Sequence, residues 1–382
     1  MLIAINQLGF GAVVAVLALY ARSFGVSQSA IGLAIAIYGF ARFAVAMPAG
    51  RLADRAGRRT GLALGGLVTG LGNLLCAFAP TYPVFIAGRF VAGAGAALVL
   101  ITGTVVLADI TTPANRGRTL AIYQGVFLFA VGVGPVPGGL LAERFGLVAP
   151  FLVYAVAGGI AGLLAWFSIP ETRGRGGVDA AELVTPAFLA QVRLLTGRVG
   201  FVLVSLVSFV TAFARTGALF NVIPVLAHDR LGLSAEQIGL GLGLASLVGL
   251  VLIYPSGVLV DRYGRKIVIM PATLVSGVSL VLFLVMPGYA WFLAGCVVWS
   301  VATGVSGAAP AAYAADTAPP GMNAAAMSAY RMLADLGYVI GPLALGAITD
   351  AFGAGVALAT AAVLLVAAAA LFALYAPDTY RL

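Results

Sequence analysis

Five charged side chains lie inside stretches that are otherwise almost entirely apolar: Arg42, Arg89, Arg215, Arg331 and Asp335. Arg331 and Asp335 are four residues apart, so in a helix their side chains share one face. A carboxylate in apolar surroundings beside an arginine can either form a lasting ion pair or alternate between a paired and a protonated state. We therefore name Asp335, with Arg331, as the first candidate for proton transfer.

The four arginines need a polar environment. An arginine that faces lipid costs about 2.5–3.5 kcal/mol on insertion scales, so four of them would cost on the order of 10 kcal/mol. They must face protein partners or a water-filled cavity. A guanidinium presents paired donors to an anionic or polar group, which makes Arg215 and Arg42 candidates for substrate binding. The alternative is that each only holds neighbouring helices together, a reading that we favour for Arg42.

The elements that carry these residues are membrane helices. The mean hydropathy is +1.09, with 62% hydrophobic and 9% charged residues, which excludes a soluble domain. A span needs about 20 apolar residues. This rule predicts twelve spans: 2–21, 29–51, 61–79, 83–108, 119–142, 149–169, 200–227, 236–258, 267–286, 289–314, 323–349 and 354–376.

The chain also contains one unit written twice. Residues 50–59 read GRLADRAGRR, and residues 257–266 read GVLVDRYGRK, an offset of 207. Tyr123 corresponds to Tyr330 at the same offset, and Pro170-Glu171-Thr172 corresponds to Pro377-Asp378-Thr379. Both ten-residue motifs lie between long apolar segments, so we expect each to form a tight cationic loop with Gly50 or Gly257 at the turn. The longest polar stretch, 171–199, falls at the repeat boundary.

Two G-x-L-x-D-R-x-G-R-[RK] motifs in two apolar halves resemble the major facilitator superfamily of secondary transporters. The resemblance implies an all-α polytopic membrane protein with two pseudo-symmetric six-helix bundles, 1–170 and 200–382. A linker, 171–199, joins them, with a short interfacial helix expected at 186–196. The resemblance also places the gating residues in the two motifs: Gly50, Asp54, Arg55, Gly57, Arg58, Gly257, Asp261, Arg262, Gly264 and Arg265.

Two further segments resemble motifs of this superfamily. Gly88-Arg89 and the small residues after it resemble a fourth-helix motif whose arginine is implicated in proton coupling; the alternative is that Arg89 only hydrogen-bonds backbone carbonyls. The second segment resembles an antiporter signature, although its first glycine is Ala130 here. It implies export, and its helix-bend candidates, with their second-half counterparts, are Gly134, Pro135, Gly138, Gly139, Gly341 and Pro342.

The function expected is alternating-access transport, with proton-coupled efflux of small amphiphilic or drug-like molecules. The alternative is a carrier for an organic or lipid-like anion, or another small metabolite, recognised by the buried arginines. The uncharged polar candidates for substrate binding are Asn6, Gln7 and Gln124. The first helix has no carboxylate, which departs from many drug/proton antiporters.

Charge distribution predicts the orientation. If both termini are cytoplasmic, fourteen basic residues fall in cytoplasmic segments, and only Arg22, Arg144 and Arg230 fall on the opposite side. Under the positive-inside rule this bias predicts a bacterial-type inner-membrane protein with both termini in the cytoplasm. The net charge of +8 is then an orientation signal and does not indicate nucleic-acid binding.

An enzyme is not expected, because one histidine and no cluster of catalytic groups are present. Cys76 and Cys296 have no metal-like spacing, and there is no phosphate-binding loop of the nucleotide-hydrolysing type. We expect no cofactor and no metal. The expected partners are a small-molecule substrate, protons and the lipid bilayer, with the chain as a monomer.

Overall fold

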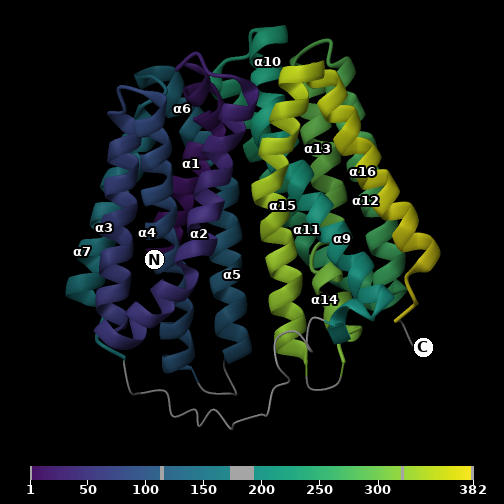
Figure 1. Ribbon diagram of the computed structural model, residues 1–382, viewed down its shortest axis with the longest axis horizontal. Coiled ribbons are helices and arrows are strands. Elements are labelled where there is room, and N and C mark those ends of the chain that lie inside the picture. Colours follow the sequence, from purple (N-terminus) through teal and green to yellow (C-terminus); the bar gives the residue numbers. More distant parts are fainter. Residues whose placement is uncertain (1, 112–115, 173–192, 320–321, 380–382) are drawn as a thin grey trace. The chain divides into compact units, whose positions relative to one another are not determined.

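The computed structural model describes residues 2–111, 116–172, 193–319 and 322–379 (Figure 1). Throughout these ranges the regular structure is helical, and no strand occurs in them. Twelve helical segments of the described residues are long and apolar enough to cross a membrane, which confirms the predicted fold class. The short helix expected at 186–196 lies largely outside the described ranges.

The helices fall into two compact units. Unit 1 consists of residues 1–179 and 234–243, and unit 2 of residues 180–233 and 244–382. The helices of unit 1 are α1 (Leu2–Arg22), α2 (Gln28–Ala56), α3 (Arg58–Ala77), α4 (Tyr82–Ile110), α5 (Arg116–Val133), α6 (Pro135–Phe145) and α7 (Ala149–Ser168). Their apolar sequences and lengths satisfy the requirement for spanning helices, with α5 and α6 together forming one span.

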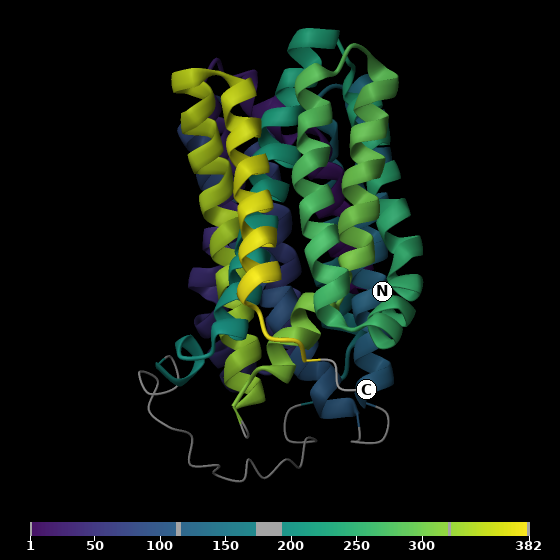
Figure 2. The ribbon, with the colours of Figure 1, turned by 90° about the vertical axis from the view of Figure 1, so that its right-hand side faces the viewer.

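Unit 2 carries the helices of the second repeat (Figure 2). They are α9 (Val199–Ala214), the π-helix η1 (Arg215–Val222), α10 (Ile223–Leu231), α11 (Ala235–Tyr263) after its first residues, α12 (Arg265–Val285), α13 (Tyr289–Ser306), α14 (Ala309–Asp316), α15 (Asn323–Phe352) and α16 (Ala354–Tyr375). In this unit α9, η1 and α10 form one continuous span, Val199–Leu231.

Small residues bring the helices of unit 1 into backbone contact. A Cβ at Gly66 on α3 would lie 2.5 Å from the backbone nitrogen of Gly162 on α7. Any larger residue there would push the two helices apart. Such close approach is typical of helix packing in lipid, where dispersion and small-residue contacts replace the hydrophobic driving force.

The repeat is visible in the backbone of each unit. The left-handed glycines Gly25, Gly57 and Gly146 have φ values of 72°, 95° and 86°. Their counterparts 207 residues later, Gly232, Gly264 and Gly353, have φ values of 65°, 87° and 88°. All six end a helix or follow it in the connecting turn, where a Cβ would be strained. The same turn chemistry therefore recurs in both halves.

The halves differ in where their helices are interrupted. The fifth span breaks between α5 and α6 at Gly134, whereas its counterpart α15 runs unbroken past Pro342. Conversely, α4 is continuous, but its counterpart is divided into α13 and α14 near Gly307. The first span is a single helix, and its counterpart contains η1. These interruptions are local specialisations of one half.

Candidate functional site

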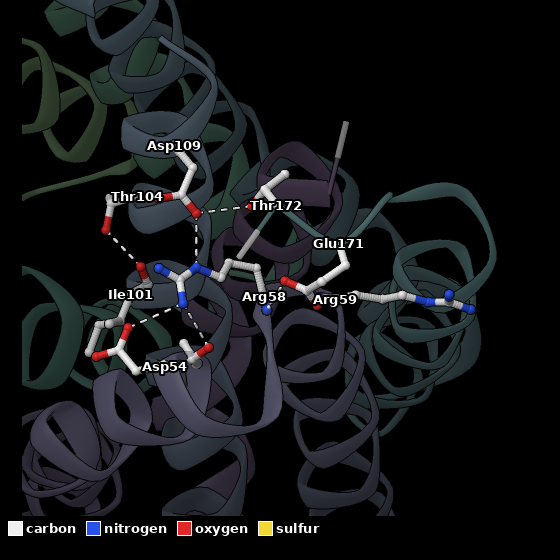
Figure 3. A network of polar contacts seen from close by, with 9 residues as sticks. Asp54, Arg58, Arg59, Ile101, Thr104, Asp109, Glu171 and Thr172 are labelled. Atoms are coloured by element: carbon white, nitrogen blue, oxygen red, sulfur yellow. Dashed lines mark hydrogen bonds and ion pairs between the residues drawn. The ribbon is translucent and has the colours of Figure 1, made fainter. Parts of the chain in front are cut away.

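A polar network surrounds Arg58 at the end of unit 1 where α2 meets α3 (Figure 3). Its Nε donates to Asp109 Oδ2 at 2.8 Å, and its Nη1 lies 3.2 Å from Asp54 Oδ1. The same nitrogen donates to the carbonyl of Ala53 at 3.1 Å. Arg58 and Asp109 have side chains only 12% and 11% exposed, whereas Asp54 is 69% exposed. The pair with Asp109 is therefore the shielded one.

Glu171 completes this network by capping α3. Its carboxylate accepts from the backbone N–H groups of Arg58 at 2.9 Å and Arg59 at 3.2 Å. A carboxylate at this position compensates the positive end of the helix dipole. Thr172 donates to Asp109 Oδ2 at 3.0 Å, so the segment after α7 is held to both α3 and α4. In Figure 3 the side chain of Arg59 points away from Arg58, and it stacks on Trp166, 4.6 Å from the ring centroid.

Unit 2 contains the corresponding ion pair, but its neighbouring contacts differ. Arg265 Nε lies 2.9 Å from Asp316 Oδ2, at the positions that correspond to Arg58 and Asp109. Those two side chains are 26% and 34% exposed. Lys266 Nζ donates to the carbonyl of Ala376 at 2.7 Å. Arg262 stacks on neighbouring Tyr263 at 5.4 Å.

The expected cationic loops are largely helical, which corrects the sequence interpretation. Gly50 lies inside α2 and Gly257 inside α11, so neither is a turn residue. The whole connection is one left-handed glycine, Gly57 or Gly264. The helices can extend through each motif because a glycine, which has no Cβ, makes the turn in a single residue with positive φ. The exposed residues Arg55 and Asp261 lie on the last turns of these helices.

Arg89 is buried in unit 1, with 1% of its surface exposed. Its Nε donates to the carbonyl of Ala34 at 3.1 Å, and its guanidinium lies 4.6 Å from the ring centroid of Tyr38. Nη1 and Nη2 have no hydrogen-bond partner among the described residues. Tyr154, also buried, is within electrostatic range of both Arg89 and Tyr38. The face of the Tyr38 ring thus stabilises the charge of Arg89, with which no described carboxylate pairs.

The other basic candidates lie in more open positions. Arg215 is exposed and is the first residue of η1, next to buried Thr216. Such π-helical turns are rare and frequently mark functional sites. It lies within electrostatic range of Tyr338 on α15. Arg42 on α2 is half-buried.

The uncharged candidates divide into two kinds. Asn6 and Gln7 on α1 are buried, and Gln7 Nε2 donates to Asn6 Oδ1 at 3.4 Å. Gln124 on α5 is exposed. The first two therefore need a rearrangement before they can contact a ligand, whereas Gln124 does not.

Arg331 and Asp335 are both exposed on α15. No ion pair joins them in the described part of the chain, although their spacing predicts one. Arg331 instead lies within electrostatic range of Tyr330, whose hydroxyl is 3.0 Å from Ser208 Oγ on α9. The i,i+4 spacing permits such a pair but does not impose it.

The bend candidates are places of tight packing. A Cβ at Gly134 would lie 2.6 Å from the Cα of Gly11 on α1. A Cβ at Gly138 would also be too close to α1, and a Cβ at Gly139 would be too close to residues 235–239 of the same unit. In unit 2, a Cβ at Gly341 would meet the Phe213 carbonyl, and Asn221 donates to the Pro342 carbonyl at 3.0 Å. The carbonyl that Pro342 leaves without its helix donor is that of Tyr338, and Thr216 Oγ1 donates to it at 3.1 Å.

The residues of these sites that were not selected from the sequence include Glu171, Tyr38 and Tyr154. The repeat of Glu171 at Asp378 was a usable signal, because both follow a proline at the end of a span. Tyr38 and Tyr154 gave no usable sequence signal, since aromatic residues are common in apolar helices. No group of three or more metal-binding side chains occurs among the described residues.

A helical protein with twelve candidate spans and ionisable groups placed along them has the architecture of a polytopic membrane transporter. The family model of the Major Facilitator Superfamily matches residues 1–234 and 204–382, so the chain belongs to that family. The resemblance inferred from the repeated motifs is therefore confirmed. The family and fold are those of transporters.

Individual relatives are distant. An uncharacterised MFS-type transporter of Methanocaldococcus jannaschii is 22% identical over 91% of this chain and 89% of its own length. Multidrug resistance protein MdtL of Salmonella paratyphi B is 28% identical over 60% of this chain, and the match spans only 57% of MdtL. A bacterial homologue of the human lysosomal transporter Spinster, solved inward-facing and occupied, has a TM-score of 0.80 at 16% identity, covering 97% and 95% of the two chains.

Proposed function

We propose that this chain is a proton-coupled exporter of small amphiphilic or drug-like molecules that works by alternating access. The observation that carries the proposal is the interruption of the fifth span at Gly134–Pro135, packed directly on α1 through Gly11. A missing helix hydrogen bond beside glycines allows bending in a region where backbones touch. The similarity of part of the chain to the multidrug resistance protein MdtL supports export of drug-like compounds.

The exposed polar residues on spanning helices support a water-filled path. Gln124, Arg215, Arg331 and Asp335 are exposed within otherwise apolar helices. Because an ionised side chain that faces lipid costs several kcal/mol, these residues are expected to face water or substrate. We assign five residues to substrate binding: Arg215, Gln124, Arg42, Asn6 and Gln7.

Proton coupling is assigned first to Asp335, with Arg331 and Arg89 as partners in the cycle. Asp335 is exposed and has no ion-pair partner among the described residues, so it is accessible to protonation. Arg89 keeps two donor nitrogens without a hydrogen-bond partner in the described structure, so it can respond to a change elsewhere in unit 1.

The two loop motifs are assigned to gating. In unit 1, Arg58 and Asp109 form the shielded pair and leave Asp54 exposed, free to exchange partners during the cycle. We propose that Asp54→Asn slows transport and leaves substrate affinity in detergent nearly unchanged. Loss of binding in a correctly inserted variant would contradict a gating role.

The positive-inside bias supports a bacterial-type inner-membrane location with both termini in the cytoplasm. We further propose that the chain acts as a monomer. A cysteine introduced near either terminus of the Cys76→Ala, Cys296→Ala background should react with an impermeant maleimide only in everted vesicles. Labelling in intact cells would reverse the orientation.

A second candidate function is transport of an organic or lipid-like anion. The observation that favours it is an excess of arginine over acid: Arg42, Arg215 and Arg331 are at least partly exposed, against Asp335 alone. Guanidinium groups bind carboxylate and phosphate in paired geometry.

One experiment separates the two functions. Everted vesicles receive an acid-inside pH gradient, and uptake of ethidium, an amphiphilic cation, is compared with uptake of carboxyfluorescein, an anion. The exporter proposal predicts ethidium accumulation that collapses with the gradient and is missing from vesicles that lack the protein. Accumulation of carboxyfluorescein alone would favour the anion carrier, and gradient-independent uptake of both would contradict proton coupling.

A further inference from the structure

Two buried side chains join the π-helix η1 to α15 inside unit 2. Thr216 Oγ1 donates to the Tyr338 carbonyl at 3.1 Å, and Asn221 Nδ2 donates to the Pro342 carbonyl at 3.0 Å. Both donor side chains are fully buried. Tyr338 and Pro342 are four residues apart, so their carbonyls lie about one turn apart on the same side of α15. The donors, Thr216 and Asn221, have no assigned part in substrate binding, coupling or gating.

The π-helical turn explains how both donors reach α15. Thr216 and Asn221 are five residues apart, and η1 contains both of them. In an α-helix, which has 3.6 residues per turn, positions five apart point in directions about 140° apart. The i→i+5 hydrogen bonds of a π-helix place such residues one above the other. This rare helix form therefore aligns the two donors with two carbonyls of α15.

The bond from Thr216 replaces one that α15 cannot make. Pro342 has no N–H, so the carbonyl of Tyr338, four residues earlier, lacks a donor within its own helix. A buried carbonyl without a donor is costly in a membrane, so the Thr216 hydroxyl stabilises α15 at this point. The same hydroxyl lies 3.0 Å from the Ala212 carbonyl, which already accepts the N–H of Arg215. The hydroxyl hydrogen is therefore available to Tyr338.

Unit 1 has the same proline without such donors. At the offset of 207, Pro342 corresponds to Pro135, and the donor positions correspond to Gly9 and Val14. Neither glycine nor valine has a side-chain donor. The fifth span is interrupted at Pro135, between α5 and α6, whereas α15 continues through Pro342. We attribute the continuity of α15 to the two donor side chains of η1.

Glycines keep α9 and η1 close enough to α15 for these bonds. A Cβ at Gly217 would lie 2.5 Å from the carbonyl oxygen of Gly341, and a Cβ at Gly341 would clash with the Phe213 carbonyl. A Cβ at Gly337 would clash with the Phe209 carbonyl. Backbone contact and two side-chain bonds thus hold η1 in one place against α15.

Arg215 begins η1 and directly precedes Thr216. It is exposed, although Ala214 and Thr216 on either side of it are buried, and it lies within electrostatic range of Tyr338. No hydrogen bond or ion pair of its side chain occurs among the described residues. The backbone of η1 therefore decides where the guanidinium starts, and the bond from Thr216 fixes that backbone to Tyr338.

We propose that Thr216 and Asn221 are positioning residues: their bonds to α15 hold η1 in its π-helical form and so fix Arg215 relative to α15. The proposal rests on the proposed function in one respect, the assignment of Arg215 to substrate binding. The exchange of a helix hydrogen bond for a side-chain bond at Pro342 does not depend on what is transported.

A double-mutant cycle with Pro342 tests the bond from Thr216 on the purified full-length chain in detergent. Thr216→Val removes the donor and should lower the melting temperature by about 2 °C or more. Pro342→Ala gives α15 its own N–H for the Tyr338 carbonyl, so Thr216→Val should lower the melting temperature less in that background. Thr211→Val is the matched control, because the Thr211 hydroxyl donates to Val207 on its own helix. Equal shifts for Thr216→Val in both backgrounds would overturn the proposed bond.

Transport kinetics test whether the two residues act through Arg215. The substrate is whichever of ethidium and carboxyfluorescein the wild type transports in everted vesicles. Thr216→Val and Asn221→Leu should each change its KM about threefold or more, in the direction that Arg215→Gln changes it. In an Arg215→Gln background neither should change it further, and Thr211→Val should leave it unaltered. Additive changes would show that the two residues do not act through Arg215.

A thiol probe at position 215 reports the placement without transport. In the Cys76→Ala, Cys296→Ala background, Arg215→Cys reacts with a soluble maleimide. Adding Thr216→Val should change the reaction rate about threefold or more, and adding Thr211→Val should not. If the wild type transports neither probe, the proposed function is contradicted while this measurement still decides the placement. An unchanged rate with Thr216→Val would overturn it.

Discussion

Arg58 donates to Asp109 through its Nε at 2.8 Å, with both side chains nearly excluded from solvent. The same pair recurs 207 residues later as Arg265 and Asp316 at 2.9 Å, but about a quarter to a third exposed. The nitrogen–oxygen distance is similar in the two repeats, but only Arg58 makes a hydrogen bond through its Nε, and solvent access differs. Since water screens an exposed pair, the two ion pairs should contribute differently to the stability of the protein.

Asp109→Asn should therefore destabilise the protein more than Asp316→Asn. The first change leaves a shielded guanidinium without its main partner, a loss of about 2 kcal/mol. The second should cost less than about 1 kcal/mol. The two apparent melting temperatures in detergent test this order. Equal shifts would show that exposure does not set the strength of the pair.

Glu171→Gln should loosen the start of α3. The variant loses the negative charge that faces two backbone N–H groups, a loss of about 1 kcal/mol. Hydrogen–deuterium exchange of the peptide that contains residues 58–60 should speed up. Glu143→Gln, an exposed acid at the end of α6, is the matched control and should change nothing there. Unchanged protection at residues 58–60 would argue against the cap.

The face of Tyr38 should stabilise the buried charge of Arg89. Tyr38→Phe keeps the ring and should cost about 1 kcal/mol at most. Tyr38→Leu removes the ring and should cost roughly 2 kcal/mol more, the scale of a desolvated cation–π contact. Repeating both changes in an Arg89→Met background isolates the coupling between the two residues. If Leu and Phe differ by the same amount in that background, the effect is packing alone.

Asp335→Asn should abolish substrate accumulation driven by a pH gradient and leave downhill exchange intact, because the amide mimics a permanently protonated carboxylate. Arg331→Gln is a useful comparison. Since no ion pair joins the two residues in the described structure, Arg331→Gln should weaken gradient-driven accumulation less than Asp335→Asn does. Uptake in everted vesicles with and without the gradient measures both. Gradient-driven accumulation by Asp335→Asn would move coupling to Arg89 and its surroundings.

The sequence by itself determined the helices, their number and their repetition. Hydropathy depends on consecutive residues, so twelve spans could be read directly. The turn glycines were not identified correctly: the two motifs predicted turns at Gly50 and Gly257, whereas Gly57 and Gly264 have the left-handed backbones. The family followed from those motifs, because two copies in register are a specific pattern.

Only the tertiary structure decided which polar groups meet. The cap on α3 joins residues 113 apart in the chain, and no periodicity reports such a contact. Arg89 interacts with two tyrosines of other helices, Tyr38 and Tyr154. Arg331 and Asp335, although spaced for pairing, form no ion pair in the described structure. Local spacing shows which contacts are possible. Burial, solvent access and the neighbours supplied by distant helices decide which of them form.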